Sequence, residues 1–209
     1  MPGLDLLLAF AAATAVFAYF PGPALLYTAA QTLARGRRAG FMAALGIHLG
    51  CYAHVFAAAF GLSAVFRHVP ELYVALKIVG AVYLVWLGIG MMRSRGTAPD
   101  PAAVAPKSAR RAFVESVVVE LLNPKVAIFF IAFLPQFVDP TASFPIWLQF
   151  LILGTIVNFA FSSADLVTVL AASTVMGKLR SDGLGRKLVR YGGGSILVGL
   201  GARLALDRT

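Results

Sequence analysis

Two short proline-containing motifs lie inside long apolar stretches and could leave backbone N–H and C=O groups free to bind a ligand. The first is "FPGPALL" and the second is "ELLNPKV". Proline cannot donate a backbone hydrogen bond, and it disfavours helical geometry in the residue before it. Each motif therefore predicts that one helix stops and another starts, with unpaired N–H groups on one side and unpaired C=O groups on the other. The residues concerned are Pro21, Gly22, Pro23, Asn123 and Pro124.

Residues around each predicted break suit the start of a new helix. Asn123 fits an N-cap position, and Pro124 fits the first helical position after it. Gly22 and Pro23 can do the same at the first motif. The competing interpretation is a simple kink, because proline bends many transmembrane helices without exposing a binding site.

Acidic side chains near these motifs could bind a cation or a proton. Glu120 lies one turn before Asn123, and Asp165 shares a predicted helical face with Asn158 and Ser162. A charge at membrane depth costs about 3 kcal/mol or more unless it is partnered or hydrated. For Asp165, a hydrogen-bonded packing role and a role as site residue or proton carrier are both open.

Two lysines and one histidine complete the candidate polar set. Lys125 could bind a carboxylate or neutralise Glu120, whereas Lys77 is a coupling candidate whose side chain could instead snorkel to the outer boundary. His54 is a candidate proton relay. The two poles of each break match an α-amino acid zwitterion, whose carboxylate would lie at the new helix starts. Its ammonium would lie at the carbonyl ends or at an acidic side chain.

Other conspicuous residues have structural interpretations. Glu115 lies close to Arg111 and predicts an ion pair near the membrane surface. Gly46 and Gly50 belong to a stripe of small residues, which predicts a close helix contact. The chain has one cysteine, and its histidines do not form a shared-face pair, so we expect no metal site and no disulfide. No nucleotide-binding motif occurs, and we expect no cofactor.

The composition places these motifs in an all-α membrane protein. The chain has 209 residues, of which 59% are hydrophobic and 13% are charged, far too apolar for an ordinary soluble domain. Six apolar stretches have the length of a membrane span. They run approximately over Leu4–Leu33, Gly40–Phe66, Glu71–Met92, Ala112–Val138, Ile146–Met176 and Leu188–Leu204.

Both motifs lie at the same predicted depth. Twelve residues run from Pro23 to Ala34, and twelve run from Arg111 to Leu122. At about 1.5 Å per residue, each break lies about 18 Å from the inner boundary, near the middle of a hydrocarbon core about 30 Å thick. Helices one and four are therefore predicted to be broken near the midplane.

Three spans on each side of the long polar loop must run in opposite directions, because three is odd. The pattern predicts a single domain over 1–209, with one repeat at about 1–93, a cytoplasmic loop at about 94–110 and an inverted second repeat at about 111–209. Broken helices at matching positions of two such repeats are typical of secondary transporters with a midplane site.

Basic residues lie almost entirely in alternate loops, which predicts the orientation. The formal charge of +9 follows from this membrane topology and does not indicate nucleic-acid binding. The bias places both termini on the non-cytoplasmic face; binding of the same loops to anionic lipid is a further option. The basic residues that follow the first, third and fifth spans are Arg35, Arg37, Arg38, Arg93, Arg95, Lys107, Arg110, Arg111, Lys178, Arg180, Arg186, Lys187 and Arg190.

Three segments, in order, resemble the LysE/RhtB family of bacterial amino-acid exporters. They are "PGPALLYTAAQTLARGRRAGFMAALGIHLG", "LKIVGAVYLVWLGIGMMR" and "NPKVAIFFIAFLPQFV". The resemblance implies efflux of small amino acids or their derivatives across the bacterial inner membrane, driven by an ion gradient. Lys77, Gly80 and Tyr83 match the family's K-x-x-G-x-x-Y pattern, which implies a family role for Lys77.

The leading hypothesis is an exporter that alternates access around the paired breaks and uses the proton or membrane-potential gradient. Its expected partners are a small amino-acid substrate and the lipid bilayer, with a homodimer as an option. A membrane-embedded enzyme using Glu120, Asp165 and a histidine is one alternative. An exporter of other ions or solutes on the same scaffold is the second.

Overall fold

The computed structural model describes residues 4–64 and 109–172, with single residues between 75 and 93 and between 191 and 202. Within these residues the chain is helical, apart from short connections. This agrees with the predicted all-α class. Lys77 and most of the predicted third and sixth spans lie outside the described residues.

Two helices cross the fold without a break. Helix α3 covers Arg37–Phe56 and continues through the π-helical segment η1, Ala57–Leu62. Helix α8 covers Ile146–Leu170. Both are long and apolar enough to cross a membrane, and they match the predicted second and fifth spans.

Two further spans are broken at the two proline-containing motifs, as the sequence predicted. Helix α1, Leu4–Tyr19, is followed by α2, Pro23–Arg35, at a bend of 44°. Helix α6, Ala109–Leu121, is followed by α7, Pro124–Ile128, at a bend of 41°. Non-helical residues separate the halves in both cases, so these are breaks and not bends in continuous helices. The second half continues through η3, Phe129–Phe133, and η4, Leu134–Phe137.

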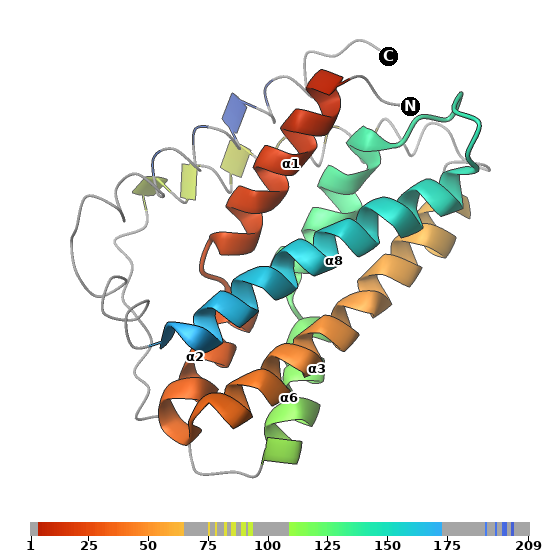
Figure 1. Cartoon of the computed structure of the whole chain (residues 1–209). Helices are drawn as coiled ribbons and strands as arrows, with labels where there is room; N and C mark the ends of the chain where they lie inside the picture. The colour runs from red at the N-terminus through yellow and green to blue at the C-terminus, as the bar shows by residue number, and fades with distance from the viewer. Residues whose placement is uncertain are drawn as a thin grey trace.

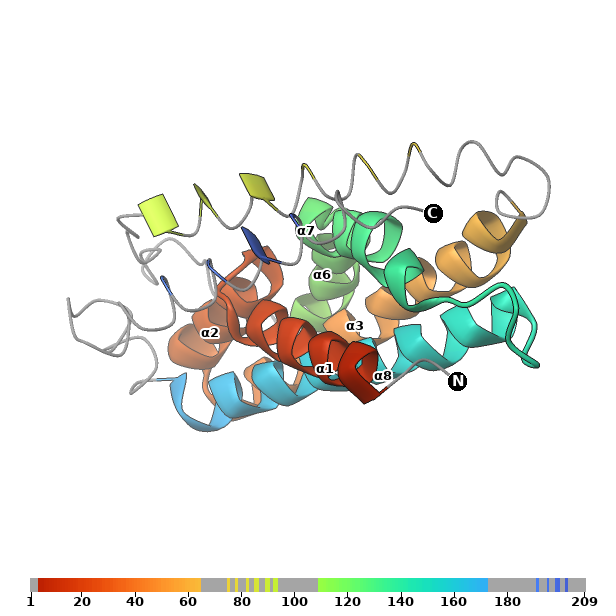
Figure 2. The same ribbon diagram turned by 90° about the horizontal axis from the view of Figure 1, so that it is seen from above.

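Helix α3 forms the central contact surface of the described part. It packs against α6, α8 and α2, and α2 also contacts α6 and α8 (Figures 1 and 2). At Gly46 an added Cβ would collide with the hydroxyl oxygen of Ser116, and at Gly50 it would lie 3.0 Å from Cβ of Glu120. The predicted close contact is therefore confirmed, because α6 occupies the space that side chains on α3 would need.

The basic ends of the described helices gather at one end of the molecule. The α2–α3 connection, the start of α6 and the end of α8 lie together (Figure 1). The guanidinium of Arg37 donates to the Leu170 carbonyl at 3.2 Å. Arg111 pairs with Glu115 at 3.0 Å, which confirms the predicted ion pair. The α1–α2 pair and α8 run toward this end, whereas α3 and α6 run away from it, in the relative directions that the loop charges predicted.

The connection between η4 and α8 carries an exposed acid at that opposite end. The side chain and then the backbone N–H of Thr141 donate to Asp139, and these bonds lower the pKa of its carboxyl. Hydrogen bonds to the charged form favour ionisation. Asp139 therefore contributes a negative charge to the end that lacks the arginine clusters.

Candidate functional site

The two breaks lie against each other and are joined by one lysine. The ammonium of Lys125 donates to the carbonyls of Phe17 and Phe20, at 2.7 Å each. Pro21 has no N–H, so the Phe17 carbonyl lacks the helical donor it would otherwise receive four residues later. Lys125, from the second break, supplies a donor that the first break is missing.

Gly22 makes this approach possible. An added Cβ on Gly22 would lie 2.8 Å from Cδ of Lys125 and 3.3 Å from its ammonium nitrogen. Real Cβ atoms do not approach another carbon at the shorter of these distances, so a larger residue would displace the lysine. The glycine of the "PGP" motif therefore leaves space for the side chain that reaches across from α7.

The hydrogen-bond partners of Lys125 bear on two sequence predictions. We expected this lysine to bind a carboxylate or neutralise Glu120, and we expected a substrate ammonium at the carbonyl ends or at an acidic side chain; both stay predictions. The chain's own ammonium binds the α1 carbonyl end and lies over the rings of Phe17 and Phe20, at 4.6 and 5.6 Å from their centroids. An external ammonium is left with the acidic side chains as its candidate partners.

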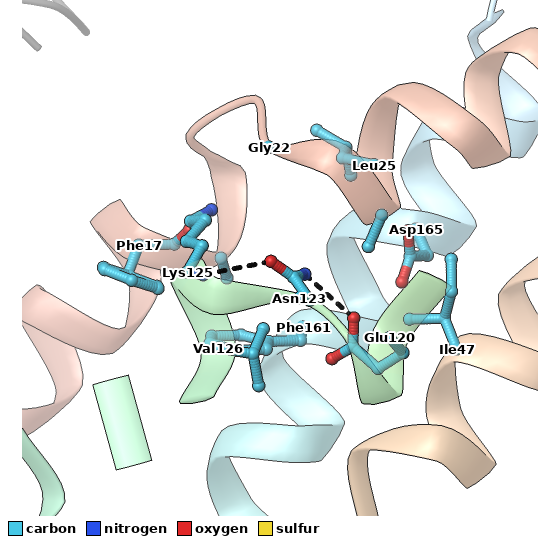
Figure 3. A pocket seen from close by; sticks show the side chains of 12 residues that line it. Phe17, Gly22, Leu25, Ile47, Glu120, Asn123, Lys125, Val126, Phe161 and Asp165 are labelled. Atoms are coloured by element: carbon cyan, nitrogen blue, oxygen red, sulfur yellow. Dashed lines mark hydrogen bonds between the residues drawn. The ribbon is translucent and has the colours of Figure 1, made fainter. Parts of the chain in front are cut away.

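At the second break, one asparagine organises both the backbone and a carboxylate. Asn123 is the N-cap of α7, as predicted: its side-chain oxygen accepts from the Lys125 N–H at 3.2 Å. Its amide nitrogen donates to Oε2 of Glu120 at 3.0 Å. Figure 3 shows Asn123 between Lys125 and Glu120. The orientation of the Glu120 carboxylate is thus tied to the start of the next helix.

His54 supports the same region from α3. Its Nε2 lies 2.9 Å from the backbone carbonyl of Glu120, near the end of α6, and must donate to it. The same carbonyl also accepts from the Asn123 N–H at 3.1 Å, so His54 is a second donor at the end of α6. His54, the predicted proton-relay candidate, is therefore hydrogen-bonded to the backbone of Glu120 and not to its carboxylate.

Asp165 approaches the breaks from α8. It is 2% exposed, and its Oδ1 accepts from the hydroxyl of Thr28 on α2 at 3.2 Å. Asn158, which shares its helical face, is also buried and donates to the backbone carbonyl of His48 at 3.1 Å. The polar face of α8 thus packs inside the protein, as expected. Asn158, however, joins α8 to α3 and lies outside the cavity described next.

A cavity of about 30 Å³ lies where the two breaks, α3 and α8 meet (Figure 3). Its polar wall includes Glu120, Asn123, Lys125 and Asp165. This volume accommodates roughly one or two water molecules, so an amino acid requires the helices to move apart. The larger apolar side chains of the wall are Phe17, Leu25, Ile47, Val126 and Phe161.

The start of α2 offers backbone donors at this cavity. Gly22 is its N-cap and provides no side-chain cap, and the first helical bond runs from the Leu26 N–H to the Gly22 carbonyl at 3.0 Å. The N–H groups of Ala24 and Leu25 precede that bond and are not needed by the helix. Both residues line the cavity. Their partial positive charge favours an anion there.

Several residues that line the cavity or contact its lining were missed in the sequence. Thr28, the partner of Asp165, belongs to a polar stripe with Gln31 and Thr32, whose three- and four-residue spacing was a readable signal in "PALLYTAAQTLAR". Phe17 and Ile47 gave no such signal, because they look like any lipid-facing or core side chain. Among the described residues, no three His, Cys, Asp or Glu side chains are close enough to hold a metal ion.

Comparisons with known proteins agree with this architecture. The family model for the LysE type translocator matches residues 15–208. An uncharacterized membrane protein of Pseudomonas aeruginosa is 32% identical over 197 residues, covering 88% of each chain. The leucine efflux protein of Salmonella typhimurium is 31% identical over 192 residues, covering 88% of this chain and 87% of the relative. No solved structure matches the chain. The protein therefore belongs to the LysE type translocator family, a family of multi-pass membrane transporters.

Proposed function

We propose that the protein is a secondary exporter of small amino acids or their derivatives, with leucine the first substrate to test. The observation that carries the proposal is the juxtaposition of two broken helices around two buried carboxylates and an apolar wall. Relatives named as leucine efflux proteins, similar over nearly their full length, support the same substrate class. The cavity between the breaks is the proposed binding site.

The proposed binding geometry uses both poles of a zwitterion. The substrate ammonium binds Glu120, with Asp165 on the facing helix. Its carboxylate binds the free N–H groups at the start of α2, beside Gly22. An aliphatic side chain packs on the apolar wall that includes Phe17 and Phe161. Each group has a complementary partner, and no substrate charge is left unpaired in an apolar setting.

Transport by alternating access follows from an inverted repeat. The proposed repeats are 1–93 and 111–209, joined by a cytoplasmic loop within one domain. Support comes from breaks of similar angle in the first helix of each repeat, and from the contact between α3 and α8, the second helices. Rocking of one repeat against the other would expose the site to each side of the membrane in turn.

Coupling to the proton gradient is assigned to Asp165, with Lys77 and His54 as accessory candidates. A buried acid that takes a proton from outside and releases it inside can drive export. Asp165→Asn should therefore keep exchange of labelled leucine for unlabelled leucine but lose accumulation driven by a pH gradient. Full pH-driven accumulation by this variant would remove Asp165 from the coupling mechanism.

The proposed location is the bacterial inner membrane, with both termini outside. Clustering of the basic helix ends at one end of the molecule supports this orientation, because basic loops remain in the cytoplasm. Single cysteines at Arg37 and Ala142, in a background without Cys51, provide the test. An impermeant reagent added to intact cells should label position 142 and not position 37. The reverse pattern would overturn the orientation.

The function itself is tested by transport in proteoliposomes. Purified protein is reconstituted and supplied with a panel of labelled amino acids under imposed pH and voltage gradients. We expect saturable exchange of leucine and accumulation only when a gradient is present. Folded protein that exchanges no amino acid in the panel would contradict the proposal.

A further inference from the structure

The inner half-helix α2 has a buried face that is mostly polar. Its buried residues are Thr28, Ala29, Gln31 and Thr32, although the segment belongs to an apolar span. Leu33, on the outward face, is exposed. This arrangement is the reverse of a helix that packs through an apolar stripe. The polar face of α2 leads from the cavity toward the arginines at the basic end of the molecule.

The hydroxyls on this face have partners close at hand. Thr28 donates to Asp165 at 3.2 Å, and Thr32 donates to the Thr28 carbonyl at 2.8 Å. Tyr27, on the neighbouring edge, donates to Oε2 of Glu115 on α6 at 3.0 Å. The last contact closes α2 against α6, between the cavity and the basic end.

Gln31 differs from these residues. It is 1% exposed, and neither amide atom makes a hydrogen bond of good geometry among the described residues, although the amide lies close to the Tyr27 hydroxyl. A buried amide whose hydrogen bonds are not made is costly, and a methionine of similar size would fill the same space without that cost. Polar side chains within membrane spans are typically found where they meet protein partners, water or a transported solute.

We infer that Gln31 forms an inner subsite, which binds the polar end of the amino acid as it moves from the cytoplasm to the cavity; this rests on the proposed function. Gln31 lies one turn inward of Thr28, the residue that contacts Asp165. Its amide can donate to a carboxylate and accept from an ammonium. Because it carries no charge, it can pass the substrate on to the charged site without trapping it.

The subsite becomes accessible when α2 separates from α6. The Tyr27–Glu115 contact, one turn closer to the cavity, breaks in that movement. The Gln31 amide then faces the opening gap and takes the substrate's polar end as its partner. When α2 packs against α6 again, as in the structure described here, the amide is buried.

The test is Gln31→Met, measured for stability and for sided transport. Removing a buried amide whose hydrogen bonds are not made should raise the melting temperature of the purified protein. Leucine transport into everted vesicles, which present the cytoplasmic face, should show a KM raised about tenfold, the effect of one hydrogen bond to a charged group. The KM for exchange from the outer face should stay within about twofold. A residue with only a structural role would not give improved stability together with a one-sided transport defect.

Leu33→Met is the matched control, because it places the same side chain on the exposed face of the same half-helix. It should leave both KM values unchanged. Gln31→Asn, which keeps an amide, should retain part of the affinity for leucine at the cytoplasmic face. If Gln31→Met transports leucine from the cytoplasmic face with the same KM as the wild type, the inner subsite is overturned and the proposed function is not. Folded wild-type protein that transports no amino acid would instead overturn the proposed function.

Discussion

The two breaks have similar bends but are stabilised in different ways. At the first, the α2 N-cap is Gly22, which offers no side chain, and the carbonyls of Phe17 and Phe20 depend on a residue from another span. At the second, Asn123 caps α7 locally and also binds Glu120. The first break therefore contributes mainly backbone groups, and the second contributes the side chains.

This difference indicates a division of roles between the two breaks. A break without its own cap leaves N–H groups free for a ligand, whereas a break capped by its own asparagine holds a carboxylate at a fixed position. Lys125 connects the two breaks, because its backbone belongs to the second and its ammonium binds the Phe17 carbonyl of the first. The site depends on their contact, and altering either break should affect the other.

Removing the connection should have the largest effect. Lys125→Met leaves two part-buried carbonyls without their donor, which should lower the free energy of unfolding by about 3 kcal/mol. Export should fall about a hundredfold, because the end of α1 and the start of α7 are no longer held together. Thermal unfolding and leucine exchange measure the two effects. Arg38→Met, an exposed change at the basic end, should alter neither. Normal exchange by the lysine variant would show that the breaks function independently.

Changing the second break alone should have an intermediate effect. Asn123→Asp retains an oxygen that can cap α7 but cannot donate to Glu120, and it places a second carboxylate beside the first. The KM for leucine exchange should rise by about tenfold or more, while the helix content measured by circular dichroism is unchanged. Asn123→Ala, which also loses the cap, should in addition lower thermal stability by about 1 kcal/mol. Equal KM values for Asn123→Asp and wild type would argue against a fixed carboxylate.

Crowding the first break should have the smallest effect of the three. Gly22→Ala puts a methyl group 2.8 Å from Cδ of Lys125, and the flexible lysine can move partly aside. We expect the exchange rate to fall about fivefold, roughly 1 kcal/mol in activation free energy. Gly61→Ala is the control, since an added Cβ there meets nothing within 4 Å. If both alanine variants transport equally well, close approach of the two breaks is not required.

Local features of the breaks could be predicted from the sequence, because they depend on neighbouring residues. Proline and the residues beside it determined where α1 and α6 end, and Asn123 preceding a proline indicated its cap. The Glu115 ion pair followed from helical spacing in the same way.

The side-chain partners between spans could not be predicted, although the close approach at Gly46 and Gly50 could, because such partners depend on how helices distant in sequence rotate against each other. The hydrogen bonds of Lys125 to the carbonyls of α1 were therefore missed, and Asn158 was predicted to bind substrate although it does not line the cavity. Thr28 was missed as the partner of Asp165 for the same reason. The polar stripe of α2 was visible, but nothing in one sequence says which helix it faces.

The most direct test of the account is the KM for leucine exchange in Glu120→Gln, measured in proteoliposomes without any gradient. Glu120 is the side chain that the second break orients toward the cavity, and binding of the substrate ammonium to it is the central claim. We predict a KM raised at least tenfold, the loss expected for one charge-assisted hydrogen bond. Asp139→Asn, which removes an acid from the connection between η4 and α8, away from the cavity, should leave the KM unchanged. A Glu120→Gln protein that exchanges leucine with the wild-type KM would contradict the claim that the paired breaks form the substrate site.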